Sequence, residues 1–131
     1  MVFAVVTGGG TSGHFIPAQA IVESLMESGI YSSELRYVGS RRGVEQSLMK
    51  GSPIEAKYLP ISGLQRSMSP KGIARNLILP VRLLRSRLMA RALIKQWKPH
   101  VVVSVGGYAS EPMSAAAIAA CNLSNARPAA A

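Results

Sequence analysis

Four segments of the 131-residue chain have the length and the apolar content of β-strands. Residues 2–6 and 100–105 are almost unbroken apolar runs rich in valine. Such runs are typical of parallel strands that are covered on both faces. Residues 35–39 predict a second short strand, and residues 56–61 predict a weaker third, for which Pro60 indicates an edge position or an early end.

Helical patterns separate these strands. An apolar stripe at helical spacing begins at Pro17, which suits the first turn of a helix, and Gly29 ends it. The other expected helices cover residues 43–50, 73–97 (with a kink or restart at Pro80) and about 111–121, and residues 62–72 are expected to be a loop. Alternating strands and helices predict a Rossmann-like α/β domain, with a parallel sheet, right-handed crossovers and helices on both faces.

Two glycine-rich turns follow strands in this arrangement. Residues 8–14 read Gly-Gly-Gly-Thr-Ser-Gly-His and follow the first strand, and Gly106-Gly107 follows the fourth. A strand, a glycine turn and a helix together aim backbone N–H groups at an anion. Because ligands of parallel sheets bind beyond the carboxyl ends of the strands, we expect both turns to lie at one edge and to face one ligand together.

The first turn formally matches a dinucleotide-binding fingerprint. Its Gly-x-Gly-x-x-Gly spacing spans residues 8–13, which alone is a weak signal. The fingerprint also needs a carboxylate at the end of the second strand to hold a ribose, whereas that strand ends in Gly39-Ser40. Arg41 and Arg42 follow and suit a 2′-phosphate, so an NADP-binding oxidoreductase remains open as a remoter alternative.

A histidine, His14, ends the first turn in the approach path of a ligand. It is either a surface residue that caps the turn, or a group that accepts a proton or donates a hydrogen bond to a phosphate. A turn that only binds needs backbone N–H groups there, so the histidine favours chemistry. His100 begins an apolar strand and is expected to be structural.

The net charge of +9 arises from one segment. Residues 66–98 contain nine basic residues and no acidic one, which favours a single anionic partner surface such as phospholipid or nucleic acid. Trp97 is the one aromatic residue there, so base stacking is not supported and nucleic acid is disfavoured. Cys121, the one cysteine, excludes an internal disulfide and is expected to be buried. No stretch has the ~18 apolar residues of a membrane span, and no cluster has the spacing of a metal site.

Several motifs, in order, resemble the MurG-type transferases of peptidoglycan synthesis. Residues 8–21 resemble the family's GGTGGH turn with the apolar pair, proline and small-residue helix start that follow it. Residues 61–64 (ISGL) are similar to its SGL element, residues 98–102 (KPHVV) to its KPDVV strand, and residues 106–112 (GGYASEP) to its GGYxSxP turn. The resemblance covers essentially the whole chain.

The resemblance implies a two-domain GT-B glycosyltransferase without metal or cofactor. The family transfers N-acetylglucosamine from UDP-GlcNAc to the C4 hydroxyl of the muramoyl sugar of lipid I, giving lipid II, at the cytoplasmic face of the bacterial membrane as a peripheral protein. By this resemblance, residues 1–131 are the acceptor-binding, membrane-associating amino-terminal domain. We expect the carboxy-terminal donor-binding domain to be absent from this chain and to be needed for activity. A non-catalytic membrane-binding subunit, acting beside a separate donor-binding chain, is the alternative.

The resemblance also assigns residues. His14 is the candidate base, and Thr11, Ser12 and Gly13 contact UDP-GlcNAc. The acceptor diphosphate lies between the two turns, on Gly9, Gly10, Gly106, Gly107, Tyr108 and Ser110.

Two residues depart from the family pattern. Ser12 replaces a usual glycine and would be strained by ~1 kcal/mol at positive φ. Glu111 replaces a small neutral residue, and its carboxylate repels a diphosphate unless it points away or caps the next helix.

The helix expected at residues 73–97, called the basic helix below, has two apolar arcs on its surface. A helix that packs on a sheet needs only one. The arc with Leu83, Ala90, Leu93, Ile94 and Trp97 is assigned to the core. The other arc is expected to enter the bilayer interface, with arginines on lipid phosphates. The membrane-facing residues are Leu77, Ile78, Leu79, Val81, Arg82, Leu84, Arg85 and Leu88. Alternatively, this arc packs on Met68 and the preceding loop.

Overall fold

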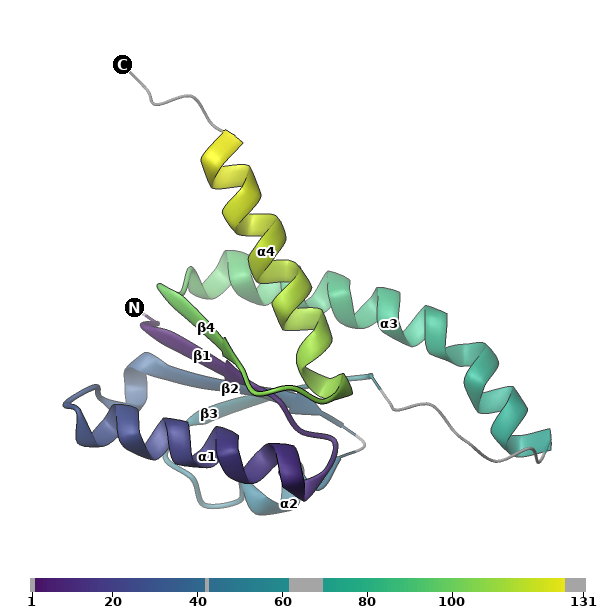
Figure 1. The fold of residues 1–131 in the computed structure, drawn as a ribbon, viewed down its shortest axis with the longest axis horizontal. Helices are drawn as coiled ribbons and strands as arrows, with labels where there is room; N and C mark the ends of the chain where they lie inside the picture. Colours follow the sequence, from purple (N-terminus) through teal and green to yellow (C-terminus); the bar gives the residue numbers. More distant parts are fainter. Residues whose placement is uncertain (1, 42, 62–69, 127–131) are drawn as a thin grey trace.

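The computed structural model describes residues 2–41, 43–61 and 70–126, and within them one parallel sheet (Figure 1). Its strands are β1 (Ala4–Thr7), β2 (Leu35–Ser40), β3 (Glu55–Leu59) and β4 (Val101–Ser104), in the order β3-β2-β1-β4. In the register of the sheet, Ala4 of β1 pairs with Leu35 on one side and Val101 on the other. The predicted Rossmann-like α/β sheet is therefore confirmed.

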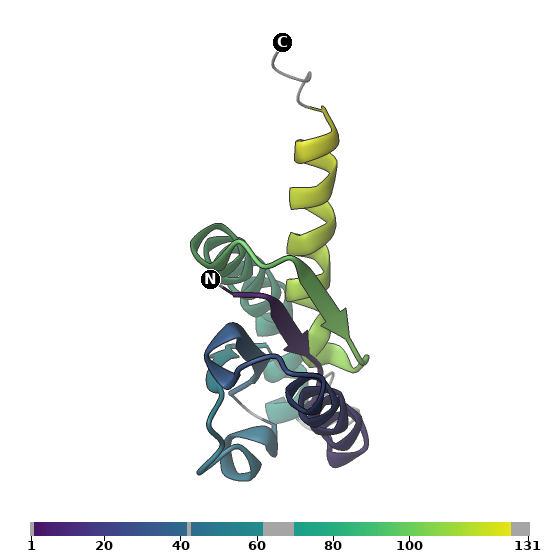
Figure 2. The same cartoon turned by 90° about the vertical axis from the view of Figure 1, so that its left-hand side faces the viewer.

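Helices cover both faces of the sheet. They are α1 (Ser12–Glu27), the short α2 (Glu45–Leu48), α3 (Pro70–Trp97) and α4 (Glu111–Ala126), with 3-10 turns η1 (Ser32–Glu34) and η2 (Tyr108–Ser110). The α1 helix lies on one face, and α3 and α4 lie together on the other, as Figures 1 and 2 show from two directions.

Two buried clusters, one on each face, explain the apolar run of β1. Val5 points toward α3 and α4 and packs in the cluster that contains Trp97. Val6, the next residue, points to the opposite face and packs in the cluster that contains Phe15 of α1. Because side chains alternate between the faces of a strand, a strand covered on both sides needs apolar residues at every position.

The helix after the first glycine turn begins five residues earlier than predicted. Thr11 is its N-cap residue, with extended φ and ψ of −136° and 158°, and Ser12 already has helical backbone conformation. Pro17 therefore lies inside α1, where it removes one helical hydrogen bond without ending the helix. The strain expected at Ser12 is absent because its φ is not positive.

The basic helix is longer and more continuous than predicted. α3 runs as one element from Pro70 to Trp97 and continues through Pro80, so of the expected kink or restart, the restart does not occur. Residues 62–69 of the preceding loop lie outside the described residues. They include Met68 and all of the ISGL motif except Ile61. α4 also continues past Cys121 to Ala126, and the Cys121 side chain is exposed rather than buried.

The position of β4 corrects a second expectation. β3 lies at one edge of the described sheet, as Pro60 indicated, but β4 lies at the other edge and is not buried like β1. Val101 is 39% exposed and Ser104 is also exposed. An apolar run shows which side chains can be buried, but not how many strands flank it.

Candidate functional site

The first glycine turn leaves β1 at the carboxyl edge of the sheet. Thr7 ends the strand, is fully buried, and donates its hydroxyl to the Val38 carbonyl oxygen at 2.9 Å. Gly10 then has a φ of +90°, and the space that a side chain would fill there is taken by the Tyr108 ring from the second turn. Both the backbone conformation and the close approach therefore require glycine at this position.

Ser110 stabilises the second glycine turn through hydrogen bonds to the Gly107 carbonyl oxygen. The Ser110 hydroxyl donates to the Gly107 carbonyl oxygen at 2.9 Å, and the Ser110 backbone N–H donates to the same oxygen at 3.3 Å. Ser110 is buried, with 5% of its surface exposed. Its hydroxyl proton is thus committed to the turn, so Ser110 supports the backbone of the turn instead of donating a hydrogen bond to a diphosphate.

The two turns meet directly, as their positions after parallel strands predicted. A Cβ atom built on Gly107, where φ is +80°, would lie 2.5 Å from the Gly9 carbonyl oxygen. The same atom would lie 3.2 Å from Cγ of His14. The two backbones therefore approach as closely as glycine allows, and the imidazole of His14 lies against the second turn.

His14 is oriented by the N-cap residue of its own helix. Its Nδ1 lies 2.9 Å from the Thr11 hydroxyl oxygen, while its ring is half-buried. Nε2 is then the ring nitrogen left for a ligand. In the tautomer that donates Nδ1–H to Thr11, Nε2 carries the lone pair and can accept a proton.

The three residues predicted to contact UDP-GlcNAc lie together at the N-terminus of α1. Thr11 and Gly13 are exposed. A Cβ on Gly13 would have only the Thr11 hydroxyl within 4 Å, at 3.9 Å, so the space beside it is open. The backbone of Ser12 continues between them as the first residue of the helix. Their contacts with UDP-GlcNAc stay a prediction.

One residue of the site, Glu45, was missed in the sequence. It is fully buried and its carboxylate accepts the Gly10 N–H at 3.1 and 3.2 Å and the Ser40 N–H at 2.7 Å. The Gly10 N–H is therefore not available to a phosphate, and Gly10 contributes to the site only by having no side chain. A glutamate on a short surface helix gives no sign of burial, although the glycines at 39 and 43 are a signal of close packing.

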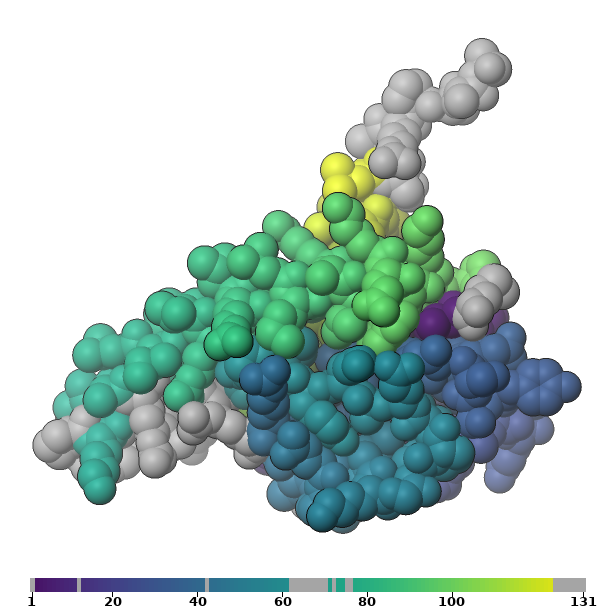
Figure 3. All heavy atoms as spheres, turned by 180° about the vertical axis from the view of Figure 1, so that it is seen from behind, coloured from purple at the N-terminus to yellow at the C-terminus, as the bar shows by residue number. Residues whose placement is uncertain are grey.

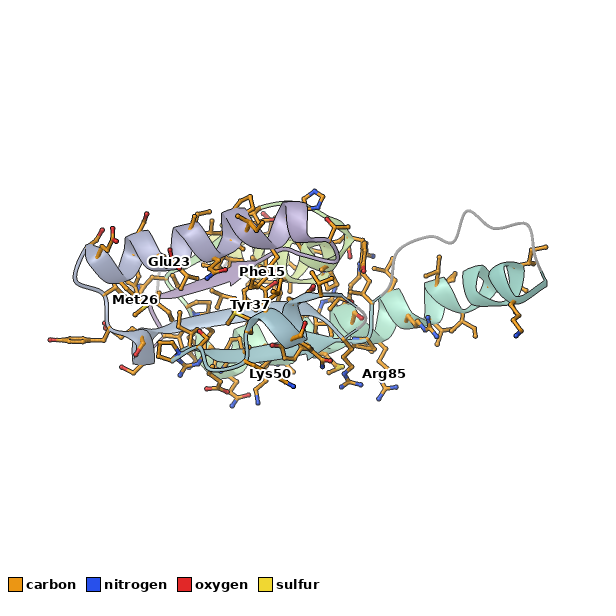
Figure 4. All side chains as sticks on the ribbon, turned by 90° about the horizontal axis from the view of Figure 1, so that it is seen from below. Phe15, Glu23, Met26, Tyr37, Lys50 and Arg85 are labelled. Atoms are coloured by element: carbon orange, nitrogen blue, oxygen red, sulfur yellow. The ribbon has the colours of Figure 1, made fainter. Side chains whose placement is uncertain are left out.

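Tyr37 holds the first turn at a second point. Its hydroxyl donates to the Gly8 carbonyl oxygen, and its ring packs edge-on against Phe15 (Figure 4). Burial, and then the nearby Glu45 carboxylate, raise the pKa of the Tyr37 hydroxyl well above its ordinary value. The hydroxyl therefore remains a hydrogen-bond donor.

The structure resolves the doubt about Glu111. This first residue of α4 forms an ion pair with Arg87 of α3, whose Nε donates to its two carboxylate oxygens at 3.0 and 3.3 Å. The carboxylate thus points toward α3 while standing at the positive end of its own helix. It does not face the turns, and the exposed Arg87 is paired with Glu111.

The two arcs of α3 divide as predicted between core and surface. Trp97 and Ala90 are buried, and Leu83, Leu93 and Ile94 pack against the same cluster. Leu77, Val81, Leu84 and Leu88 are between 55% and 75% exposed and, with Ile78, form the apolar stripe of α3. Leu79 and Arg82 are half-buried, whereas Arg85 is exposed and extends away from the helix (Figure 4). The stripe is exposed, and its contact with a membrane stays a prediction. The alternative contact with Met68 and the preceding loop falls outside the described residues.

The described residues contain neither a metal cluster nor a membrane-spanning helix. No three side chains among His, Cys, Asp and Glu are grouped there as a metal site requires. No helix there has both the length and the apolar content to cross a bilayer.

Comparisons with known proteins decide the family. Residues 4–122 match the glycosyltransferase family 28 N-terminal domain. The chain belongs to this family. The crystal structure of Acinetobacter baumannii MurG is similar over 92% of this chain and 33% of that chain, with a TM-score of 0.73 and 27% identity. The GT-B type predicted for the fold is supported by this likeness.

Relatives of known activity are also similar. The UDP-N-acetylglucosamine--N-acetylmuramyl-(pentapeptide) pyrophosphoryl-undecaprenol N-acetylglucosamine transferase of Latilactobacillus sakei is 41% identical over 106 residues, which cover 81% of this chain and 29% of that protein. The enzymes of the same name from Phocaeicola vulgatus and Klebsiella pneumoniae are 36% and 37% identical, over 82% and 86% of this chain and 27% and 30% of theirs. The chain therefore spans less than a third of the length of these relatives. The family favours glycosyl transfer over the NADP alternative.

We predict that Gly107→Ala destabilises the fold more than Gly29→Ala does. Both residues have positive φ, at +80° and +99°, but an added Cβ meets the Gly9 carbonyl at Gly107 and nothing within 4 Å at Gly29. Backbone strain costs both variants about 1–2 kcal/mol, and the clash adds roughly 1–3 kcal/mol for Gly107→Ala alone. Urea unfolding of both variants measures the difference, and equal losses would show that the turns are not in contact.

Proposed function

We propose that this chain is the acceptor-binding, membrane-associating domain of an N-acetylglucosaminyltransferase that converts lipid I to lipid II. The observation that carries the proposal is the meeting of Gly9 and Gly107 with the His14 ring beside them. The membership in glycosyltransferase family 28 and the named activity of the relatives support it. Its setting is the cytoplasmic face of the bacterial membrane, where the protein is peripheral.

Two helix N-termini favour a diphosphate at this place. α1 and α4 each contain 16 residues. α1 begins at Ser12, within the first glycine turn, and α4 begins directly after η2. Each helix carries about half a positive charge at its N-terminus, and the two ends lie at one edge of the sheet. The backbone of Gly9, Gly106, Gly107 and Tyr108 lines this edge without bulky side chains on the glycines. In the proposal, these residues bind the acceptor diphosphate.

The proposed reaction is a single inverting displacement. Nε2 of His14 accepts the proton of the acceptor C4 hydroxyl while the hydroxyl oxygen attacks the anomeric carbon of UDP-GlcNAc. The bond from that carbon to the UDP oxygen breaks, and UDP leaves with the electron pair. The Thr11 hydroxyl lies within hydrogen-bond distance of Nδ1 and can accept Nδ1–H in the tautomer that this step needs. A carboxy-terminal donor-binding domain supplies the other half of the site.

The topology places the apolar stripe near the same edge. Because α3 returns from β3 to β4, its first half lies toward the carboxyl ends of the strands (Figure 1). That half carries Leu77 and Val81 and extends beyond the body of the domain, as the teal part of Figure 3 shows. A lipid-linked acceptor needs its membrane anchor and its diphosphate close together, which this arrangement provides.

Replacing His14 tests the proposed base. We expect His14→Ala to lower the transfer rate roughly 10²–10⁴-fold, measured as N-acetylglucosamine transfer to lipid I. The protein to use is a chimera in which this chain replaces the matching amino-terminal part of the Latilactobacillus sakei relative. His100→Ala, which changes an exposed histidine whose ring is tilted against that of Phe3, is the matched control and should keep the rate. A loss below tenfold for His14→Ala would remove the base role.

A mixing experiment beside the chimera separates the proposal from its alternative, a non-catalytic membrane-binding subunit. If the chain is instead a non-catalytic subunit, it should support transfer only when mixed with a separate donor-binding chain, and His14→Ala should not change that rate.

Reversing one charge tests the membrane surface. We expect Arg85→Glu to weaken binding of this chain to vesicles that contain anionic phospholipid by roughly 30-fold, because each basic residue near such a surface contributes ~1 kcal/mol and the reversal counts twice. Lys95→Glu is the control, since Lys95 is exposed on the last turn of the same helix beside α4. Equal losses for both variants would show that only net charge matters, and unchanged binding for Arg85→Glu would place the stripe elsewhere.

A further inference from the structure

We propose that Glu45 is a positioning residue that fixes the first glycine turn against the second. The chemical meaning of this role rests on the proposed function, but the geometry does not. Glu45 touches neither His14 nor Gly107 in any hydrogen bond of the described residues, so it acts through the backbone of the first turn.

The buried carboxylate of Glu45 accepts its hydrogen bonds from backbone N–H groups. None of its surface is exposed, and the ion pairs of the described residues, Arg36–Glu55, Lys57–Glu55 and Arg87–Glu111, do not include it. A buried carboxylate without hydrogen bonds is strongly disfavoured. The N–H groups of Gly10 and Ser40 supply those bonds, and they come from the first turn and from the end of β2.

Three glycines leave the space that the carboxylate occupies. A Cβ on Gly9 would lie 2.6 Å from Oε1 of Glu45, and a Cβ on Gly39 would lie 3.0 Å from the same atom. A Cβ on Gly43 would overlap both carboxylate oxygens. Gly39 and Gly43 do not have positive φ, so the backbone conformation does not require glycine there. The space for Glu45 is the physical reason for Gly43. At Gly39 the Tyr37 ring shares that role with Glu45, because its edge would lie 2.8 Å from an added Cβ.

The peptide unit between Gly9 and Gly10 transmits the position of Glu45. Its N–H end donates to the carboxylate, as described above. Because the C=O and N–H of a trans peptide point in opposite directions, its carbonyl is directed away from Glu45. That carbonyl oxygen is the atom that lies closest to the side-chain position of Gly107. Glu45 therefore sets the orientation of the peptide that touches the second turn.

The proposal makes a spectroscopic prediction for this chain alone. In Glu45→Gln, the charge-assisted bonds become neutral ones, and we expect the Gly10 and Ser40 amides to exchange with solvent about tenfold faster. We also expect the amide signals of Gly106 and Gly107 to move, although these residues do not contact Glu45. Gln46→Ala is the control, because Gln46 is exposed on the same short helix and should leave these four amides unchanged.

Gly43→Ala provides a second variant that leaves Glu45 in place. Its added methyl group displaces the carboxylate, so it should shift the same amides of both turns. In a chain that also carries Glu45→Ala, the clash has no partner, and Gly43→Ala should add nothing further. This non-additivity identifies the carboxylate as the cause. It also keeps the proposal testable if Glu45→Gln does not fold.

Signals of Gly106 and Gly107 that stay in place in both Glu45→Gln and Gly43→Ala would overturn the proposal. In the chimera described above, Glu45→Gln should raise KM for lipid I about tenfold or more and leave KM for UDP-GlcNAc within twofold. Amide shifts without transferase activity in the parent chimera would instead show that the positioning role holds and that the proposed function fails.

Discussion

The close approach of two backbones, Gly9 in the first turn and Gly107 in the second, is the constraint on which this site depends. It is possible because neither residue has a side chain, and a single Cβ at Gly107 would come within 2.5 Å of the Gly9 carbonyl. The parallel sheet brings the two turns to one edge, and α1 and α4 begin next to them. His14, on the first turn of α1, consequently lies against the second glycine turn.

Side chains from β2 and α2 hold the first turn in place. The Tyr37 hydroxyl donates a hydrogen bond to the Gly8 carbonyl oxygen, and the Glu45 carboxylate accepts one from the Gly10 N–H. Both ends of the glycine segment are therefore held by side chains of β2 and α2. On the other side of the sheet, the Arg87–Glu111 ion pair joins α3 to the start of α4. The acidic residue that departs from the family pattern thereby ties the basic helix to the second turn, instead of repelling a diphosphate.

Much of the fold was predictable because its signals are local. Apolar runs mark strands, and glycines after strands mark turns, so the meeting of residues 8–14 and 106–107 followed from topology. The role of Glu45 was not predictable, because burial of a charge depends on distant partners such as Gly10 and Ser40. The edge position of β4 and the early start of α1 were not predicted for the same reason. Local composition does not show which strands lie next to each other or how long a turn is.

The central claim is that both glycine turns bind one diphosphate. It is tested most directly by titrating the isotope-labelled chain with a water-soluble isoprenoid diphosphate while following the amide signals of Gly9, Gly106 and Gly107. We predict that the signals of both turns move along one saturation curve. Movement in one turn alone, or two curves with different midpoints, would contradict it.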